Sequence, residues 1–464
     1  MTKDLTSGNP FKIILLFTLP LMLGNLFQQF YSLADTIIVG RFVGVNALAA
    51  VGATGSVNYL ILGFVIGMCN GFAIPIAQLF GAHDDSDLRR HVANATWLCI
   101  AWGVVLTVVT VALTRPIMEL MQTPADIIDG ASTYIGWIFA GIPFVFLYNM
   151  VSAIMRALGD SKRPLYFLLA AGVVNVLLNL VFVIKLHMDV AGVALATVIS
   201  QCISAALVIR CLMKETGPLR LDLKKLKIHG MKLKQIMQVG IPAGLQGVLF
   251  SLANVTVQSS INSFDDTVLV AGSSASSSVE NFVYANVNAF YQANTAFTSQ
   301  NFGAGNYKRI LKVRHTAVAA GVLSTSLLGW LAILFGHQLL GIYSTSPDVV
   351  QAGMLRMWFL LILYGLDALM DVQVGSMRGI GYNVTPMLVS LVGACVLRLI
   401  WLATVFQIPA YHRIETVYIV YPISWIMTAL AHGICFSFAY RKVVRNFKSM
   451  EESPAPSEAP TAVS

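Results

Sequence analysis

The sequence predicts an all-α polytopic membrane protein, with twelve transmembrane helices in two pseudo-twofold-related six-helix bundles around a central cleft. Three observations predict it. Of 464 residues, 56% are apolar and only 11% are charged, whereas soluble domains carry about 25% charged residues. The apolar residues form twelve long runs, and several segments recur at one constant offset. A transmembrane β-barrel is excluded because its strands alternate polar and apolar residues.

Each apolar run is long enough to cross a bilayer, which takes roughly 20 residues. The first run lacks the small-residue cleavage site of a signal peptide, so we expect it to be a retained helix. Charged or turn-forming stretches separate the runs. The twelve runs lie at approximately 11–39, 46–80, 90–114, 130–156, 164–186, 190–213, 233–262, 268–301, 310–337, 349–376, 384–408 and 417–440.

The distribution of basic residues predicts the orientation. An even number of spans places both termini on one side, and 24 of the 30 Lys and Arg residues then fall on that side, Arg156 and Arg378 among them. Five fall on the other side, including Arg356, and Arg398 remains inside a span. Because positive residues concentrate in cytoplasmic loops, we expect a cytoplasmic (cell) membrane protein with both termini in the cytoplasm. The net charge of +8 then requires no nucleic-acid partner.

The two halves of the chain repeat each other at a constant offset, the one that separates Pro20 from Pro242. A shared offset over three separate segments indicates a tandem duplication of a six-helix unit. Two copies with an even number of helices insert in the same orientation, related by an axis along the membrane normal. The matching segments are MRALGDSKRP from Met155 with MRGIGYNVTP from Met377, QLFGA from Gln78 with QNFGA from Gln300, and Pro20 with Pro242.

This duplication predicts four parts. An N-terminal six-helix lobe covers 1–215, a basic cytoplasmic linker 216–232, a C-terminal six-helix lobe 233–448, and a Pro-rich tail, expected to be disordered, 449–464. Rocking of two such lobes would expose the cleft between them to each side in turn, which is the geometry of a transporter.

Polar residues in the first span recur at steps of three and four, so they share one helical face. They are Asn25, Gln28, Gln29, Ser32 and Asp35. Asp35 is the only acid in this span, and a charge at bilayer depth usually faces a cavity or a partner. We interpret Asp35 as an ion-coupling residue and Gln28 and Gln29 as substrate-binding residues. The alternative is a helix-end carboxylate paired with Arg41.

Two further features of the first lobe bear on coupling. Asn175 and Asn179 lie at i, i+4 in the fifth span and, with Asp35, could hold a proton or a coordinated Na⁺; alternatively they bond between helices as packing residues. Pro20 removes a backbone hydrogen bond in mid-span, so it is a candidate hinge or, alternatively, a static kink.

In the second lobe, Asp367 and Asp371 lie at i, i+4 in the tenth span. Two carboxylates this close in a low dielectric cannot easily both be ionised, so the pair is a candidate proton or cation site. Arg398 in the eleventh span is the expected countercharge and a candidate substrate contact, or alternatively one partner of a structural salt bridge with one Asp.

The eighth span is too polar to face lipid and should line the cleft; the alternative is a helix buried against its own lobe. Its aromatic rings would suit flat organic cations by cation–π attraction. The substrate-binding candidates on it are Glu280, Tyr284, Asn288 and Gln292. The six cysteines form no CxxC pair, so we expect buried small hydrophobes and no metal site. His432 stands alone in the twelfth span and is expected to be a hydrogen-bonded packing residue.

With these motifs the chain resembles the multidrug and toxic compound extrusion (MATE) family over roughly residues 10–445. The resemblance rests on the stretch from Leu19 to Gly40, on QLFGA and MRALGDSKRP with their repeats, and on VAGVALATVISQ (190–201). It implies twelve helices in two bundles and export of drugs or metabolites driven by inward H⁺ or Na⁺. The family's first-helix and tenth-helix acids match Asp35 and Asp367.

Two departures from the family pattern leave the coupling ion open. Many members have an Asp in the fifth span, where this chain has Asn179, and one subfamily has a seventh-span acid that is missing from 240–255.

The sequence therefore predicts a monomeric antiporter that exports amphipathic organic cations or drugs. H⁺ is favoured over Na⁺ as the coupling ion, and no other cofactor is expected. The alternative is a flippase for lipid-linked precursors, disfavoured because the acids assigned to the cleft outnumber Arg398. We expect no enzyme activity, since HExxH, a GxSxG with a partner His and GxxxxGK[ST] are not found in the sequence.

Overall fold

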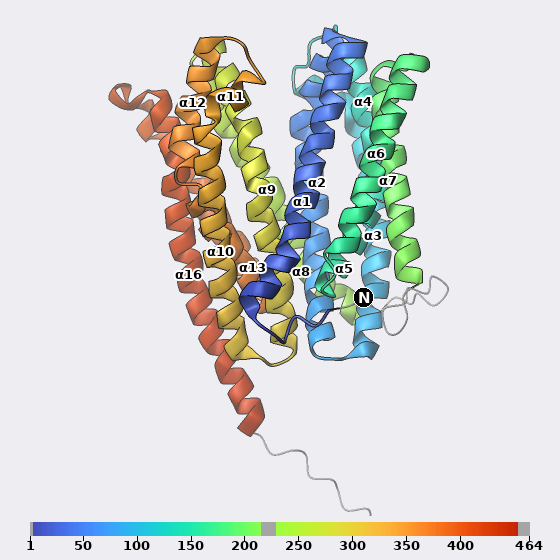
Figure 1. Cartoon of the computed structure of the whole chain (residues 1–464), viewed down its shortest axis with the longest axis vertical. Helices are drawn as coiled ribbons and strands as arrows, with labels where there is room; N and C mark the ends of the chain where they lie inside the picture. Colours follow the sequence, from blue (N-terminus) through green and yellow to red (C-terminus); the bar gives the residue numbers. More distant parts are fainter. Residues whose placement is uncertain (1–2, 215–228, 453–464) are drawn as a thin grey trace, which may run out of the picture.

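The computed structural model describes residues 3–214 and 229–452. Long helices running side by side make up this part of the chain, and we find no strand in it (Figure 1). Most of the predicted linker and tail lies outside the described residues, so the predicted domain boundaries stay a prediction.

Residues 3–214, the described part of the first half, form seven α-helices. Two of them continue into a π-helical turn, at Val39–Val43 after α1 and at Val181–Lys185 after α6. The helices are α1 (Pro10–Ile38), α2 (Val45–Gly81), α3 (Asp85–Leu120), α4 (Ile128–Ala140), α5 (Ile142–Ala157), α6 (Lys162–Leu180) and α7 (Asp189–Met213).

The second half repeats this pattern with more interruptions. A π-helical segment at Leu391–Val396 joins α14 to α15. The helices are α8 (Gly230–Asn262), α9 (Thr267–Gly303), α10 (Tyr307–Leu334), α11 (Gly336–Gly341), α12 (Pro347–Leu361), α13 (Gly365–Gly379), α14 (Val384–Ser390), α15 (Leu397–Ala403) and α16 (Ile414–Glu452). Two 3₁₀ turns, Val405–Gln407 and Pro409–Tyr411, lead into α16.

The helices account for the twelve expected spans. In the described residues nine helical segments are long and apolar enough to cross a membrane, and two bent pairs, α4 with α5 and α12 with α13, each complete one more. The twelfth is α9, which has 37 residues and is long enough to cross a membrane, but a run of serines makes it too polar to be counted among the nine. The protein is therefore a multi-pass membrane protein, and the residues that the structure describes are consistent with twelve helical spans.

Two spans that the sequence predicts as single helices are bent. The fourth bends by 44° at Gly141, where Pro143 in the first turn of α5 has no N–H to continue the hydrogen-bond ladder. The tenth bends by 49° between Leu361 and Gly365. The second bend brings Asp367 into the first turn of α13, so the break determines where this acid lies.

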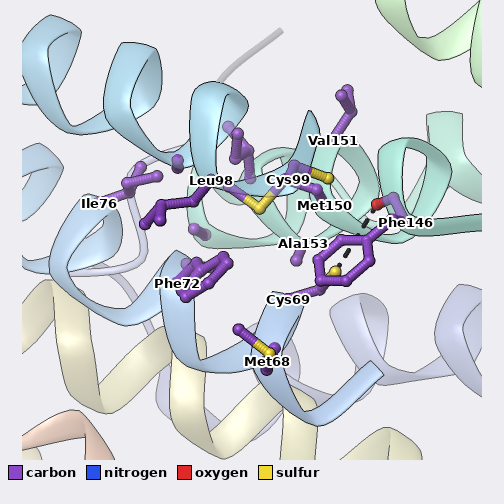
Figure 2. Close-up of a cluster of buried hydrophobic side chains, with 14 of the residues drawn as sticks. Met68, Cys69, Phe72, Ile76, Leu98, Cys99, Phe146, Met150, Val151 and Ala153 are labelled. Atoms are coloured by element: carbon purple, nitrogen blue, oxygen red, sulfur yellow. Dashed lines mark hydrogen bonds between the residues drawn. The ribbon is translucent and has the colours of Figure 1, made fainter. Parts of the chain in front are cut away.

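Apolar side chains fill the interior of each lobe. In the first lobe, α2, α3 and α5 enclose Phe72, Phe146 and Met150, which are almost fully buried (Figure 2). Cys69 and Cys99 belong to this core, and the Cys69 thiol donates to the Phe146 carbonyl. All six cysteines are free thiols, and the described residues contain no metal-binding group of His, Cys, Asp and Glu.

The lobes meet along α2 and α8, where small residues let the backbones approach closely. A Cβ added at Gly67 would lie 2.5 Å from the Ala243 carbonyl oxygen, and one added at Gly247 would lie 2.6 Å from that of Gly63. Both distances are shorter than any real contact. Such glycine-lined contacts are a common way to pack membrane helices, and this one holds the two lobes together.

The repeated motifs close one end of this interface, the lower end in Figure 1, where α2 and α9 end. Gln78 donates to the Gly379 carbonyl at 2.9 Å, and Gln300 donates to the Ala157 carbonyl at 2.7 Å. The offset of the internal repeat relates the two donors and also the two acceptors. Each lobe therefore offers the other the same bond, from its QxFGA motif to the partner lobe's MRxxG motif. We call this end the closed end.

The N-terminal segment crosses the closed end and ties the lobes further. The Lys3 amide donates to the Leu158 carbonyl of the first lobe at 3.0 Å, and the fully buried Leu5 donates its amide to Gln300 of the second. Arg309 binds the carbonyls of Ser7 and Gly8. Hydrogen bonds of the N-terminal segment thus join both lobes at the closed end.

Candidate functional site

The first-lobe site is built on Asp35 of α1, which lies against α6. Asp35 is half-buried and accepts a hydrogen bond from Asn179 Nδ2 at 2.5 Å. The Asn179 amide also donates to Asn175 Oδ1 at 3.2 Å, and Asn175 donates to Thr197 of α7 at 3.3 Å. Because Asn175 and Asn179 are one turn apart, both amides reach the same side of α6. Asp35, Asn175 and Asn179 therefore form the hydrogen-bonded cluster that the sequence predicts. Their role in ion binding stays a prediction.

One acceptor of this cluster has no partner. The amide oxygen of the fully buried Asn179 accepts no hydrogen bond. An unpaired buried acceptor costs roughly 1–3 kcal/mol. The site can therefore accept a proton donor or a cation beside the Asp35 carboxylate.

The other candidates on α1 lie along the same helix. Gln28 is exposed and Gln29 half-buried, and Asn25 crosses to the second lobe by donating to the Ala285 carbonyl at 3.0 Å. Pro20 is buried inside α1, three residues after Phe17, whose ring meets Phe297 of α9 edge-on at 5.5 Å. The first helix therefore packs against α9, while its hinge role stays a prediction.

The second-lobe acids lie one turn apart on α13 in different surroundings. Asp367 is 6% exposed, and its Oδ2 has no hydrogen-bond partner. Asp371 is half-buried and accepts a bond from the Tyr284 hydroxyl of α9 at 3.1 Å. Asp367 thus lies inside the lobe, and Asp371 stands between α13 and the polar face of α9.

Arg398 does not pair with either acid. Its Nε donates to Ser424 at 2.9 Å, and its guanidinium lies 4.4 Å from the centre of the Tyr421 ring. Among the described residues, no ion pair within 4.0 Å includes Arg398, Asp367 or Asp371. The structural salt bridge considered as an alternative is not formed, and Arg398 is held by a hydroxyl and an aromatic face.

Glu280 lies inside the second lobe. Its carboxylate binds the Nε and Nη2 of Arg356 at 2.8 and 3.0 Å and accepts from Ser276. Arg356 also donates to Ser273 at 2.7 Å. Arg356, which charge sorting assigned to the outer face, is 5% exposed and pairs with Glu280. A buried pair of this kind orders α9 against α12, and the role of Glu280 in substrate binding stays a prediction.

The remaining candidates on α9 share one half-buried face. Tyr284, Asn288 and Gln292 follow at steps of four residues, and Gln292 donates to Asn288. Gln292 also lines a cavity between α9 and the first lobe. His432 is fully buried and shares a hydrogen bond with Ser390 at 3.2 Å.

Two arginines near the closed end, which charge sorting assigned to cytoplasmic loops, are at least partly buried. Arg378, expected at the cytoplasmic membrane face, is only 4% exposed and lies within the bundle. Arg156, its equivalent in the repeat, lines the same cavity as Gln292. Arg398 is therefore not the only base inside the protein. Arg156 and Arg378 are equivalent in the internal repeat, and this equivalence was the signal in the sequence that they share a structural role. Sorting the basic residues by charge instead assigned both to loops.

Comparison with known proteins places this fold in a family. The MatE family model matches residues 20–181 and 242–403, and the offset between the two matches is that of the repeated motifs. The probable multidrug resistance protein YoeA of Bacillus subtilis is 27% identical over 95% of this chain and 96% of its own length. The probable multidrug resistance protein NorM of Thermotoga maritima is 24% identical over 84% of each.

Solved structures agree with the fold. An outward-facing multidrug resistance MATE family transporter of the MOP superfamily superposes with a TM-score of 0.87 at 20% identity, covering 98% of this chain and all of that one. A MOP superfamily transporter from Pyrococcus furiosus gives 0.85 at 20% identity with the same coverage. With two family matches spanning most of the chain and the fold in agreement, this protein belongs to the MatE family.

Proposed function

We propose that this protein is a cation-coupled antiporter that exports amphipathic organic cations or drugs by alternating access. The observation that carries the proposal is a pair of acid sites inside the bundles: Asp35 with Asn179 in one lobe, and Asp367 with Asp371 in the other. Ionisable residues at this depth are costly and usually functional. The names of the relatives, multidrug resistance and export proteins, support the class of cargo.

Asp35 has the surroundings for an exchange of proton and cargo. When ionised, the carboxylate accepts from Asn179 Nδ2. When protonated, it becomes a donor, and the unpartnered Asn179 Oδ1 is the acceptor beside it. Binding of the ion therefore reverses the hydrogen bond between α1 and α6. In this proposal that reversal biases the two arrangements of α1, and Pro20 makes bending of the helix easier.

The coupling ion in this proposal is H⁺. The acid sites are a single carboxylate and a carboxylate pair, which bind a proton without a complete ligand shell. Na⁺ is the second candidate, because the unpartnered Asn179 oxygen is a group that a hard cation prefers.

Orientation and assembly complete the proposal. We place the closed end in the cytoplasm, because the excess of basic residues falls on that side. In this proposal the protein acts as a monomer in the cell membrane, and the arrangement with the closed end joined is the state that is closed toward the cytoplasm.

Transport by purified protein in proteoliposomes tests this function. Ethidium efflux is measured under a pH gradient and then under a Na⁺ gradient of equal size. We expect transport under the pH gradient and acidification coupled to ethidium movement. Transport under the Na⁺ gradient alone would assign Na⁺ instead, and no transport under either would reject cation-coupled export of organic cations. Transfer of a phosphate-linked lipid across the bilayer without cargo export would favour the flippase.

Asp35→Asn tests the coupling residue. The amide cannot bind a proton, so we expect ethidium export to be abolished while membrane insertion and yield stay normal. Thr36→Ala, an exposed position on the same helix whose hydroxyl donates to the Ser32 carbonyl one turn earlier, is the matched control for loss of a polar side chain. Full export by the Asp35 variant would reject its role.

A further inference from the structure

Between the lobes, directly above the closed end, lies a cavity that the proposed coupling sites do not use. The empty volume is about 340 Å³, open solvent included, and α2, α5 and α9 line it. Asn70 and Arg156 come from the first lobe, and Tyr291, Gln292 and Ser299 from the second. Its neighbours Ala157 and Gln300 form one of the bonds of the closed end. The cavity exists as one site only while the lobes are joined there.

Two arginines lie at or beside this cavity: Arg156 on its wall, and Arg378 bound to the Tyr291 hydroxyl. Arg156 has one hydrogen-bond acceptor, Asn70 Oδ1 at 3.1 Å. Arg378 donates to the Tyr291 hydroxyl at 2.6 Å and to Gln246 at 2.7 Å. In the described part of the chain no ion pair includes either arginine. Charges buried in proteins are normally paired, so a buried Arg378 and a half-buried Arg156, both with neutral partners, indicate a missing anion.

Hydrogen-bond donors without a partner also indicate a missing anion. The Ser299 hydroxyl, on the cavity wall and fully buried, has no partner. The buried Nε of Arg378 also has none. The Tyr291 hydroxyl accepts from Arg378, so its own proton remains available to an acceptor in the cavity. Guanidinium and hydroxyl groups together are the donor set that binds carboxylate or phosphate oxygens.

The acid and base sites lie along one face of α9. Tyr284 touches Asp371, and Tyr291, seven residues later, touches Arg378 and lines the cavity. Seven residues of α-helix span about 10 Å. A cargo with a cationic group near Asp371 and an anionic group in the cavity would satisfy both ends.

We propose that this cavity is a subsite for an oxyanionic group, with Arg156 as its principal ligand, and that its occupant is the carboxylate of a zwitterionic cargo. The identification of the occupant as cargo rests on the proposed transport function; the anion site itself does not. When the closed end opens, Arg156 leaves with the first lobe while Ser299 and Tyr291 leave with the second. The site then comes apart, so anion binding depends on the closed conformation.

Equilibrium binding of a matched dye pair tests the site. Fluorescence polarisation measures a rhodamine with a free carboxylate, and the methyl ester of the same dye, on full-length protein in nanodiscs without any ion gradient. We expect Arg156→Gln to raise the Kd of the carboxylate dye about tenfold or more, the loss of one charge-assisted hydrogen bond. The ester should bind equally to both proteins. Equal weakening of both dyes, or no change in either, would overturn the proposal.

Two further variants remove the dependence on a single substitution. Asn70→Asp places a carboxylate of nearly the same shape where Arg156 has its acceptor, so we expect it to remove the preference for the free carboxylate without enlarging the cavity. Ser299→Ala should weaken only the carboxylate dye. Arg115→Gln, an exposed arginine that binds Glu119 and Asp129, is the control for loss of a positive charge elsewhere. A normal thermal unfolding curve for each variant excludes misfolding.

Competition by inorganic phosphate distinguishes two possible occupants of the anion site, a free oxyanion and the carboxylate of the cargo. Displacement of the carboxylate dye by millimolar phosphate, with the ester unaffected, would mean that free oxyanions fill the site and would overturn the assignment to cargo. Retention of the dye supports the carboxylate of the cargo. Because binding is measured without transport, a failure of ion-coupled export in proteoliposomes would leave these results unchanged, and the two proposals can fail separately.

Discussion

At the scale of single residues, the acids differ in what surrounds them. Asp35 and Asp371 are half-buried and each accept a bond from a neutral donor, Asn179 or Tyr284. Glu280 instead has a full set of partners in the interior, including both ends of the Arg356 guanidinium. A carboxylate with neutral partners can change its protonation without leaving a charge unpaired, whereas Glu280 cannot.

Glu280→Gln should therefore destabilise the protein more than it affects recognition of cargo. The change leaves Arg356 buried and uncompensated, a loss of about 3–5 kcal/mol. We expect a clear fall in the melting temperature in detergent, measured by a thiol-reactive or tryptophan fluorescence assay. Removing the second charge as well, in Glu280→Gln with Arg356→Met, should recover much of the loss. An unchanged melting temperature for the single variant would contradict the structural role.

At the scale of the elements, the crossing of α2 and α9 depends on two glycines. A Cβ at Gly81 would overlap the Gln300 carbonyl, and one at Gly303 would overlap the Gln78 carbonyl. The two positions are equivalent in the internal repeat, like Gln78 and Gln300. The helix ends can thus cross at backbone contact only because both positions lack a side chain.

Gly81→Ala or Gly303→Ala should force the closed end apart. Spin labels placed on the two lobes at this end would report longer distances by pulsed electron spin resonance. Gly52→Ala and Gly55→Ala are matched controls in α2, since a Cβ at either meets nothing within 4 Å. Unchanged distances in the Gly81 and Gly303 variants would mean that the helices adjust locally and the crossing does not control closure.

At the scale of the whole molecule, a small number of bonds holds the lobes closed at one end. The bonds from Gln78 and Gln300 are equivalent by the internal symmetry and join opposite lobes. A net contribution of about 1 kcal/mol for each bond is small enough for ion or cargo binding to overcome. The closed arrangement can therefore be one of two states of comparable free energy, as alternating access requires.

Gln78→Ala should shift the balance toward the open arrangement about fivefold, and Gln300→Ala by more, because it also removes the acceptor of the Leu5 amide. Together the two changes should shift it by about the product of the single effects. Single-molecule fluorescence transfer between labels on the two lobes measures the populations. Gln351→Ala, an exposed position on α12, is the control. If the double variant stays fully closed, the glycine contact of α2 with α8 and the N-terminal segment hold the end without these bonds.

Much of the fold could be read from the sequence, because in a membrane the backbone must satisfy its own hydrogen bonds and long apolar runs must be helices. The twelve spans and the shared face of Asn175 and Asn179 followed from length and periodicity. The internal repeat likewise predicted a symmetric pair of bundles, and the family model matches the two halves at the same offset.

Only the tertiary structure decided which charges face which partners. Charge counting placed Arg356 and Arg378 at membrane faces, but packing buries both, one against Glu280 and one against Tyr291 and Gln246. Arg398 donates a hydrogen bond to Ser424 and lies over the Tyr421 ring, and it forms no direct ion pair with Asp367 or Asp371. Span length and orientation depend on local composition, whereas the partner of a buried charge depends on helices far apart in the chain, and no local pattern records how those helices rotate against each other.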